Sequence, residues 1–354
     1  MSKLKVKTKP LKPKSNFTIV DIARLAGVNP STVSRALAGS HSVTEETRDK
    51  ISAIARENGY IANHSARMLR SGRANQILVI VPNIAAFAHP EVILGIEEAL
   101  EERNIGVIVG STKGNHEREL ALARQLVTGA ADGLILLNGS LPSELSELRQ
   151  YTRRIVAVSR PVDFPGVAFV GIDNEAAAFE ATQYLISLGR TRITHLAGPE
   201  QSSIFAARAK GYRDAMAEAS LQMHTEVLHL PLFNIASGRQ AMREILTRRH
   251  LPDAVLCASD ELAFGAIQAS RELGIKVPDQ IAFVGFDNHP VSEAFSPPLT
   301  TVAVPRKQLG YVGAQTLLRS MSEDSDEGGT QLLPYELIVR ASCGRNRWEG
   351  QQEF

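Results

Sequence analysis

From residue 76 onward, short apolar runs alternate with longer stretches of helical periodicity. This alternation predicts parallel β-sheets covered by helices, because parallel strands need a crossover connection and are buried on both faces. The expected strands are 77–81, 107–110, 134–137, 155–158, 193–197, 254–258 and 281–285. The expected helices are 91–103, 117–128, 176–188, 206–219, 237–248, 261–273 and 306–319.

This β-α region spans roughly 275 residues, which exceeds one ordinary hydrophobic core, so two lobes are expected. In open α/β sheets a ligand lies at the carboxyl ends of the strands, where the loops gather. Two such lobes facing one another would form a ligand-binding cleft.

The first 73 residues carry a different pattern, of short helices with strong start and stop signals. Thr18 and Asp21 form a capping-box-like start, with Asp in place of the usual Glu. Asn29 is suited to cap a second helix, whose first position suits Pro30. The remaining signals are Gly27, Gly39 and Gly59 as stops and Thr44 as the cap of a third helix. Two helices of about eight residues around a Gly-containing turn predict a helix-turn-helix.

Charge is distributed unevenly between these regions. Residues 1–73 have 14 Lys/Arg and five Asp/Glu, a net charge of +9. The rest of the chain has 25 Lys/Arg and 33 Asp/Glu, a net charge of −8. A basic head on an acidic body indicates that the head meets a polyanion, although a basic segment can also serve solubility alone. Residues 1–16 alternate Lys with Pro, Thr and Val and are expected to be a disordered basic arm.

Several classes of protein are disfavoured. No apolar run approaches the ~20 residues of a membrane span, and the N-terminus has no apolar h-region of a secretory signal. Cys257 and Cys343 have no disulfide-framework or metal-ligand spacing, so a reducing cytoplasm, no metal and no cofactor are expected. The dinucleotide, P-loop, zinc-protease and nucleophile-elbow motifs are absent from the sequence, which disfavours an enzyme. A transport binding protein would have a signal and no DNA-binding head.

These residues together resemble the lactose-repressor (LacI/GalR) family of bacterial transcription regulators. In the head the resemblance is carried by TIVDIARLAGV (18–28), STVSRAL (31–37), VTEETR (43–48), GY (59–60) and NHSARML (63–69). In the body it is carried by DGLI (132–135), GRTRI (189–193), GY (211–212), VP (277–278), GFDN (285–288) and PPLTTV (297–302). It covers residues 18–343.

The resemblance implies an all-α helix-turn-helix domain followed by a two-lobed, periplasmic-binding-protein-like α/β body with parallel sheets. The expected divisions are a basic arm (1–16), a DNA-binding domain (17–62), a hinge helix (63–73), an effector-binding and dimerisation body (74–343) and a tail (344–354). Within the body, the N-lobe is expected at about 74–172 and 303–322, and the C-lobe at about 173–302 and 323–343. The tail has no leucine heptad, which favours a dimer over a tetramer.

The second helix of a helix-turn-helix lies in the major groove with its N-terminal residues at base edges. By position those are Pro30, Ser31 and Arg35, of which Arg35 can bond guanine bidentately. Side chains suited to phosphates are Thr18, Asn29, Thr32, Ser34 and Thr47. The resemblance places Asn63, Ala66 and Leu69 in a hinge helix that folds in the minor groove as a pair, with Leu69 as a wedge at a central base step.

Three body positions match ligand-binding ones of the family: Asp173, Arg208 and Asp287. Either aspartate could instead cap a helix, and Arg208 could be a surface ion pair. The departures from the family pattern include His89, Lys113, Arg160 and Ser259. The basic side chains among them would make the cleft more basic than one built for a neutral sugar. A basic cleft favours an anionic effector such as a sugar acid or sugar phosphate, while acidic residues balance part of this charge.

The resemblance therefore predicts a homodimeric regulator that binds a pseudo-palindromic double-stranded DNA operator in the cytoplasm, at the nucleoid, with no membrane partner. A repressor of a carbohydrate catabolic operon is expected, controlled by a small-molecule effector between the lobes. A neutral sugar, a nucleobase or a corepressor remains the alternative effector.

Overall fold

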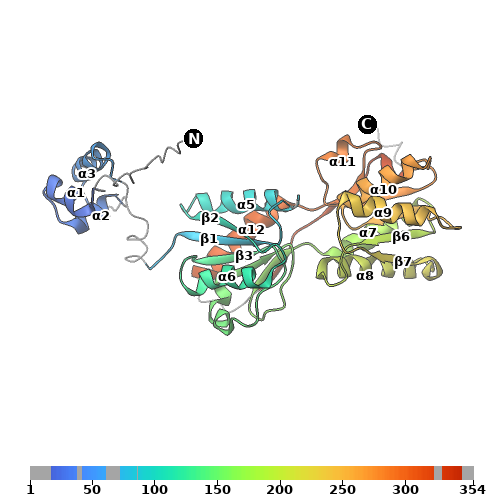
Figure 1. The fold of residues 1–354 in the computed structure, drawn as a ribbon, viewed down its shortest axis with the longest axis horizontal. Helices are drawn as coiled ribbons and strands as arrows, with labels where there is room; N and C mark the ends of the chain where they lie inside the picture. The colour runs from blue at the N-terminus through green and yellow to red at the C-terminus, as the bar shows by residue number, and fades with distance from the viewer. Residues whose placement is uncertain (1–16, 38–41, 61–71, 86, 323–328, 345–354) are drawn as a thin grey trace, which may run out of the picture. The chain divides into compact units, whose positions relative to one another are not determined.

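The structure is a computed structural model that describes residues 17–37, 42–60, 72–85, 87–322 and 329–344. The chain divides into two compact units, Met1–Arg73 and Ala74–Phe354 (Figure 1). Each unit has its own hydrophobic core, so each is described by itself.

The described residues of the first unit form three helices, α1 (Ile19–Ala26), α2 (Pro30–Leu37) and α3 (Glu45–Glu57). The capping box predicted at Thr18 and Asp21 is present, with each side chain bonded to the other residue's backbone N–H. Gly27 ends α1 at φ 71°, a left-handed conformation that glycine adopts without strain. Ile22, Val33 and Ile51 of the three helices meet in one buried core. Thr44 precedes α3 as expected, but its hydroxyl donates to the Thr47 hydroxyl instead of capping the helix.

The second unit has two six-stranded sheets, each forming a lobe. The first lobe (N-lobe) has the strand order β11-β5-β4-β3-β1-β2, and all its neighbouring strands pair in parallel. Its strands are β1 (Gln76–Val81), β2 (Gly106–Ser111), β3 (Gly133–Leu136), β4 (Ile155–Val158), β5 (Ala168–Gly171) and β11 (Thr330–Leu332). Its helices are α5 (His89–Glu101), α6 (His116–Val127), the 3-10 helix η1 (Ser146–Arg154) and α12 (Arg306–Ser322).

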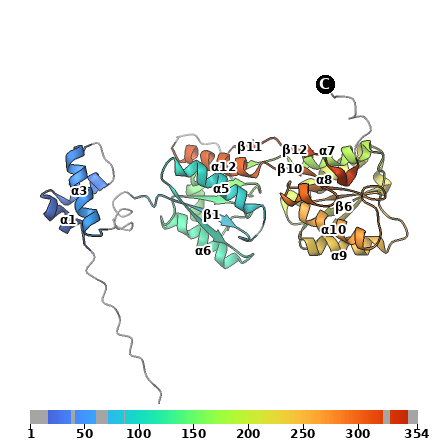
Figure 2. The ribbon, with the colours of Figure 1, turned by 90° about the horizontal axis from the view of Figure 1, so that it is seen from above.

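Helices α5 and α12 cover one face of the first sheet, and α6 and η1 cover the other (Figure 2). The crossing of α5 and α12 requires glycine. A Cβ on Gly95 would lie 1.9 Å from the Lys307 carbonyl oxygen, and one on Gly310 would lie 1.9 Å from that of Val92. The two backbones therefore touch, which fixes where the N-terminus of α5 lies relative to the first residues of α12.

The second lobe (C-lobe) has the strand order β12-β10-β9-β8-β6-β7, with only β12 antiparallel to its neighbour. Its strands are β6 (Ile193–Ala197), β7 (Glu226–His229), β8 (Ala254–Cys257), β9 (Ala282–Phe286), β10 (Thr300–Ala303) and β12 (Glu336–Ile338). Its helices are α7 (Asn174–Ser187), α8 (Ser203–Glu218), α9 (Ile235–Leu246), α10 (Asp260–Glu272) and α11 (Val291–Ala294), with short 3-10 turns η2 (Gln222–His224) and η3 (Ala341–Cys343). Helices α7 and α8 pack on one face of this sheet, and α9 and α10 on the other (Figure 2).

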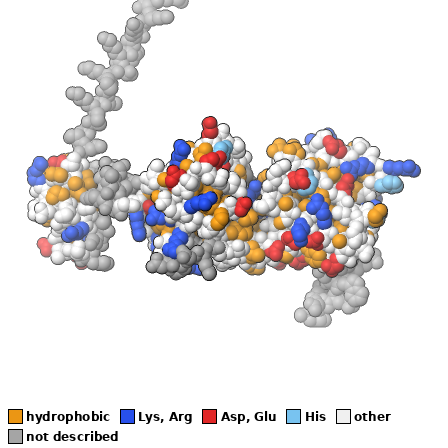
Figure 3. Space-filling model, turned by 90° about the horizontal axis from the view of Figure 1, so that it is seen from below, with side chains coloured by type: hydrophobic (Ala, Val, Ile, Leu, Met, Phe, Trp, Pro, Cys, Tyr) orange, Lys and Arg blue, Asp and Glu red, His pale blue; other side chains and the backbone are white. Residues whose placement is uncertain are grey.

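The chain passes between the lobes after β5, after β10 and between β11 and β12. On the face of the body in Figure 3, acidic and basic side chains are interspersed over both lobes. No helix of the described residues is long and apolar enough to cross a membrane.

All seven strands and seven helices predicted for the body are present; β4 and β6 have the predicted ends, and the other elements have ends shifted by one to three residues. Five further strands are present that were not expected from the sequence: β5, β7, β10, β11 and β12. The architecture expected from the β-α alternation is confirmed: a helical head and an α/β body of two largely parallel sheets.

Candidate functional site

A cavity of about 480 Å³ lies in the second unit, lined from both lobes. It opens where the strands of both sheets end. Ser159 and Arg160 follow β4, Ala258 and Ser259 follow β8, and Asp287 follows β9. The cavity therefore occupies the place that a parallel α/β sheet reserves for a ligand.

Arg208 of α8 is the centre of the C-lobe wall, and its charge is fully engaged. Arg208 is 5% exposed. Its Nε donates to Asn174 Oδ1 at 2.9 Å, and its Nη1 donates to the Ala258 carbonyl at 2.6 Å. Its guanidinium lies 4.0 Å from the centroid of the Phe286 ring, and its Nη2 lies 4.0 Å from Asp287 Oδ1. Burial lowers the pKa of Arg208 to about 10, so the side chain remains a cation at neutral pH.

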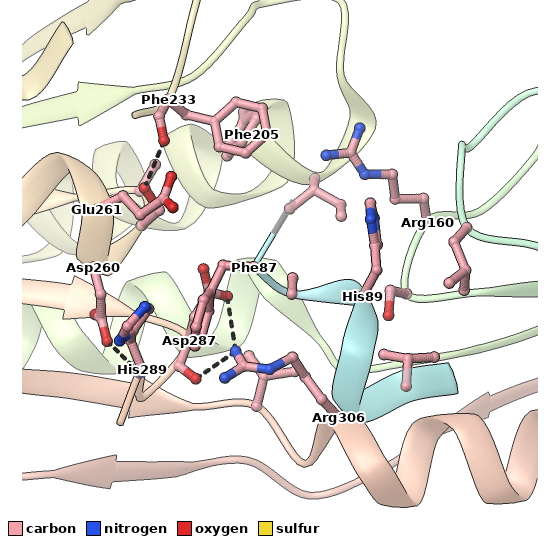
Figure 4. Close-up of a pocket in the computed structure, with 18 of the residues that line it drawn as sticks. Phe87, His89, Arg160, Phe205, Phe233, Asp260, Glu261, Asp287, His289 and Arg306 are labelled. Atoms are coloured by element: carbon pink, nitrogen blue, oxygen red, sulfur yellow. Dashed lines mark hydrogen bonds and ion pairs between the residues drawn. The ribbon is translucent and has the colours of Figure 1, made fainter. Parts of the chain in front are cut away.

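Asp287 lies in a backbone conformation that side chains rarely adopt, at φ 106°. Arg306, at the start of α12, holds this residue by donating from Nη1 to the Asp287 carbonyl at 2.5 Å. Arg306 also donates from Nε to Glu91 of α5 at 3.0 Å. One buried guanidinium therefore ties the N-lobe helix α5 to the C-lobe loop that presents the Asp287 carboxylate (Figure 4).

Asp260, the first residue of α10, is a buried carboxyl group beside this loop. Its oxygens accept hydrogen bonds from Thr301 Oγ1 at 2.6 Å, Ser292 Oγ at 2.6 Å and the His289 N–H at 2.7 Å. Burial, reinforced by the charge of Asp287, raises the pKa of Asp260 to about 7. Asp260 thus organises the loop after β9 while it contributes polarity to the cavity.

Aromatic side chains form two further parts of the wall. Phe87 of the N-lobe stacks on His289 of the C-lobe, with ring centroids 3.4 Å apart and planes at 25°. Phe205 and Phe233, both of the C-lobe, lie 5.1 Å apart in a tilted pair, next to Glu261 in Figure 4. Flat apolar faces next to carboxylates and cations suit a ligand with both ring faces and polar edges.

The N-lobe wall carries His89 and Arg160. His89 is 8% exposed and its Nδ1 lies 2.9 Å from the Asn83 carbonyl oxygen. Burial lowers the pKa of His89, which favours the neutral ring. Arg160 is half-buried, and this burial lowers its pKa, while the charge of Asp287 acts in the opposite direction. Its guanidinium makes no hydrogen bond or ion pair to any residue that the structure describes, in contrast to Arg208.

The structure brings together five of the seven predicted effector-binding residues. These are His89, Arg160, Arg208, Ser259 and Asp287. Asp173 and Lys113 do not line the cavity, contrary to the expectation that both face it. The Asp173 carboxylate accepts from the Ala176 N–H at 2.9 Å and caps α7, and Lys113 is exposed at φ 53° in the turn before α6.

Seven lining residues with charged or aromatic side chains were not among the predicted binding residues. They are Phe87, Phe205, Phe233, Asp260, Glu261, His289 and Arg306. Their signal in the sequence is positional, since most of them follow a strand or begin a helix. That position alone does not say which side chain enters the cavity and which faces solvent.

In the first unit, α2 buries Val33 and Ala36 and leaves Pro30, Ser31 and Arg35 exposed. The predicted phosphate-contacting residues Thr18 and Asn29 are exposed, and Thr32, Ser34 and Thr47 are half-buried. The Thr18 hydroxyl donates to Asp21 Oδ2 at 2.6 Å, so its first role is in the helix cap. Asn63, Ala66 and Leu69 lie outside the described residues.

Two family models match the chain. Residues 18–63 match bacterial regulatory proteins of the lacI family, and residues 182–343 match the periplasmic binding protein-like domain. The HTH-type transcriptional repressor CytR of Escherichia coli K12 is 33% identical over 338 residues, covering 94% of this chain and 98% of that protein.

Two solved structures are similar over most of the chain. The lac repressor dimer bound to operator and the anti-inducer ONPF has a TM-score of 0.82 at 26% identity, covering 94% of this chain and 100% of that one. The complex of the transcriptional regulator CelR with cellobiose has a TM-score of 0.69 at 30% identity, covering 92% and 99%.

The fold and site define a class, in which a helix-turn-helix DNA-binding unit is joined to a two-lobed ligand-binding body. Within that class the chain belongs to the lacI family of bacterial regulatory proteins. Members of this family are DNA-binding transcriptional regulators, not enzymes.

Proposed function

We propose that this protein is a repressor of a carbohydrate catabolic operon, released from or held on its operator by a small molecule in the interlobe cavity. The observation that carries the proposal is the combination, in one chain, of an exposed polar face on α2 and a cavity lined by the half-buried cation Arg160, which makes no hydrogen bond or ion pair to a described residue. The protein would act in the cytoplasm as a homodimer, because a pseudo-palindromic operator matches two-fold symmetry.

On the DNA side, α2 would enter the major groove with Pro30, Ser31 and Arg35 at base edges. Its buried positions, Val33 and Ala36, anchor the helix in the core of the first unit, so the exposed side chains are free to contact DNA. Arg35 would bond a guanine bidentately. Thr18, Asn29, Thr32, Ser34 and Thr47 would contact phosphates and fix the register. Asn63, Ala66 and Leu69 would act in the minor groove.

On the effector side, the Asp287 carboxylate and the Arg208 guanidinium would bind hydroxyl groups of a sugar-derived ligand. Arg160 would pair with an anionic group, which favours a sugar acid or sugar phosphate. His89 and Ser259 would complete the polar contacts.

The runner-up effector is a neutral sugar or a nucleobase. The cavity lining contains Asp260, Glu261 and Asp287, which can balance its three arginines, and Phe87, Phe205 and Phe233 offer ring faces. The structure of CelR with cellobiose and that of a LacI family regulator from Enterococcus faecium with bound ribose are relatives whose ligands are neutral sugars.

The proposal is tested by thermal unfolding of the full-length protein against neutral sugars, sugar acids, sugar phosphates and nucleobases. A ligand at about 100 times its Kd should stabilise the folded state by about 2.7 kcal/mol and raise Tm by a few degrees. An operator selected from random DNA then reports whether that ligand changes DNA affinity. A stabilising ligand without any effect on operator binding would contradict the proposed regulation.

A further inference from the structure

The N-lobe wall of the cavity has three features that together describe an anion site. Helix α5 begins there without a side-chain cap, since Ala88 at its N-cap makes no capping hydrogen bond. A free helix N-terminus favours a negative charge. Arg160 adds a half-buried cation that makes no hydrogen bond or ion pair to a described residue, so its charge is open to an anionic group in the cavity.

The third feature is the unused nitrogen of His89. A carbonyl oxygen only accepts hydrogen bonds, so the contact to the Asn83 carbonyl makes Nδ1 the N–H donor. In the neutral ring, Nε2 is then an acceptor, and no described residue bonds to it. An anion beside it needs a proton between the two, either on the imidazole or on the anion.

This requirement distinguishes between anions. A phosphate monoester has its second pKa at about 6, close to the ~6.5 of an ordinary imidazole. A carboxylic acid has a pKa of about 4, and a sulfate ester carries no proton near neutral pH. Since burial lowers the pKa of His89, the imidazole holds a proton here only if its partner shares it. The phosphate monoester is the anion best matched to share one.

We infer that the N-lobe wall binds the phosphate-monoester group of the effector, with Arg160 as its cation and His89 sharing a proton with it. The inference rests on the proposed function and selects the sugar phosphate from its two anionic classes. The sugar portion would then extend across the cavity toward Asp287 and Arg208. The charges of these two residues already face one another.

The other charged groups around the cavity set the background for this proton. Its remaining lining cations are Arg208 and Arg306, and Arg306 is bonded to Glu91, on the same helix as His89. Its acids are Asp260, Glu261 and Asp287 of the C-lobe, and its other imidazole is His289, stacked on Phe87. These groups belong to the opposite wall or to α12, and Asp287 and Arg208 interact electrostatically with Arg160.

The test measures binding of methyl phosphate and methyl sulfate to the full-length protein by calorimetry, at about pH 6.5 and constant ionic strength. The two probes have the same shape, but only the phosphate can share a proton. We expect methyl phosphate to bind at least about tenfold more tightly, which corresponds to about one pKa unit of proton sharing. Arg160→Met should weaken methyl phosphate binding by about tenfold or more, and His89→Gln should bring the two probes within about threefold of each other.

Arg249→Met is the matched control. Arg249 is an exposed cation in a second basic hollow, which Arg192, His224 and His250 also line. Its loss should leave both affinities unchanged. No binding of methyl phosphate, binding that Arg160→Met does not weaken, or equal affinities for the two probes in the parent protein would each overturn the inference.

The inference and the proposed function fail in different ways. A neutral sugar that changes operator affinity, in a protein that does not bind methyl phosphate, overturns only the phosphate site. A phosphate ester that binds at Arg160, in a protein whose operator affinity responds to no cavity ligand, supports the phosphate site and overturns the proposed regulation.

Discussion

The two walls of the interlobe cavity each hold an arginine, the buried Arg208 in the C-lobe and the half-buried Arg160 in the N-lobe, and the two differ in their contacts. Arg208 of the C-lobe bonds Asn174 and a backbone carbonyl, covers the Phe286 ring and faces Asp287. Arg160 of the N-lobe has no such partner among the described residues. Arg208 therefore stabilises its own lobe as well as lining the site, whereas the Arg160 guanidinium is available to a ligand.

The largest expected effect is a difference in stability between variants of these two arginines. Arg208→Met leaves Asn174 Oδ1 and the Ala258 carbonyl without their donor in a buried place, so we expect a loss of about 3 kcal/mol or more in the free energy of unfolding. Arg160→Met, its matched control, breaks no protein contact and should stay within about 0.5 kcal/mol. Urea denaturation of both variants measures this, and equal losses would erase the distinction between the walls.

The next largest effect should be on the pH dependence of stability, and it comes from a buried histidine in the same lobe as Arg208. His195 of β6 is fully buried, its Nδ1 contacts the Leu256 carbonyl at 3.0 Å, and burial lowers its pKa from 6.5 to about 4. The unfolded chain binds this proton first, so the stabilising contribution is complete above pH 6.5 and is lost as the pH falls to about 4. This contribution of His195 to the free energy of unfolding is about 3 kcal/mol.

His195→Gln should therefore flatten the acid side of the stability profile. Stability measured by urea at several pH values between 4 and 7 reports the slope. Identical slopes for the parent and the variant would show that His195 does not titrate in this window.

A smaller and different effect is expected in the DNA-binding unit. Arg35 is exposed on α2, so Arg35→Ala should leave the free energy of unfolding within about 0.5 kcal/mol. It should cost about 1–3 kcal/mol of discrimination at a single operator base pair. Affinities for operators varied one base pair at a time measure this. A uniform loss on every sequence would make Arg35 a phosphate contact.

The smallest effect should come from Lys113. Its side chain is exposed and lies outside the cavity, so Lys113→Ala should change neither ligand affinity nor stability by more than about 0.5 kcal/mol. Calorimetric titration with a cavity ligand checks it. A strong loss of ligand affinity would show that Lys113 belongs to the binding site.

Local sequence signals predicted most of the fold. The capping box at Thr18, the stop at Gly27 and the β-α alternation are all decided by neighbouring residues, and the structure contains each of them. The strands that were missed are short, and β7, β11 and β12 lie at sheet edges, where no long apolar run marks them.

The candidate site was predictable in part, because the family resemblance supplied Arg208 and Asp287 by position. Which polar residue after a strand enters the cavity was not, since Asp173 satisfies its own helix instead. The contact between Arg306 and Glu91 could not be predicted either. These two residues are 215 residues apart in sequence, and only the folding of the N-lobe brings them together.

We propose that the occupant of the cavity sets the affinity of the helix-turn-helix unit for DNA. The most direct measurement is operator affinity with and without a cavity ligand, in the parent protein and in Asp287→Asn. We predict that the ligand changes the operator Kd of the parent by at least about tenfold, a coupling of about 1.4 kcal/mol, and leaves that of the variant unchanged. An equal change in both proteins, or no change in the parent with the cavity occupied, would contradict the account.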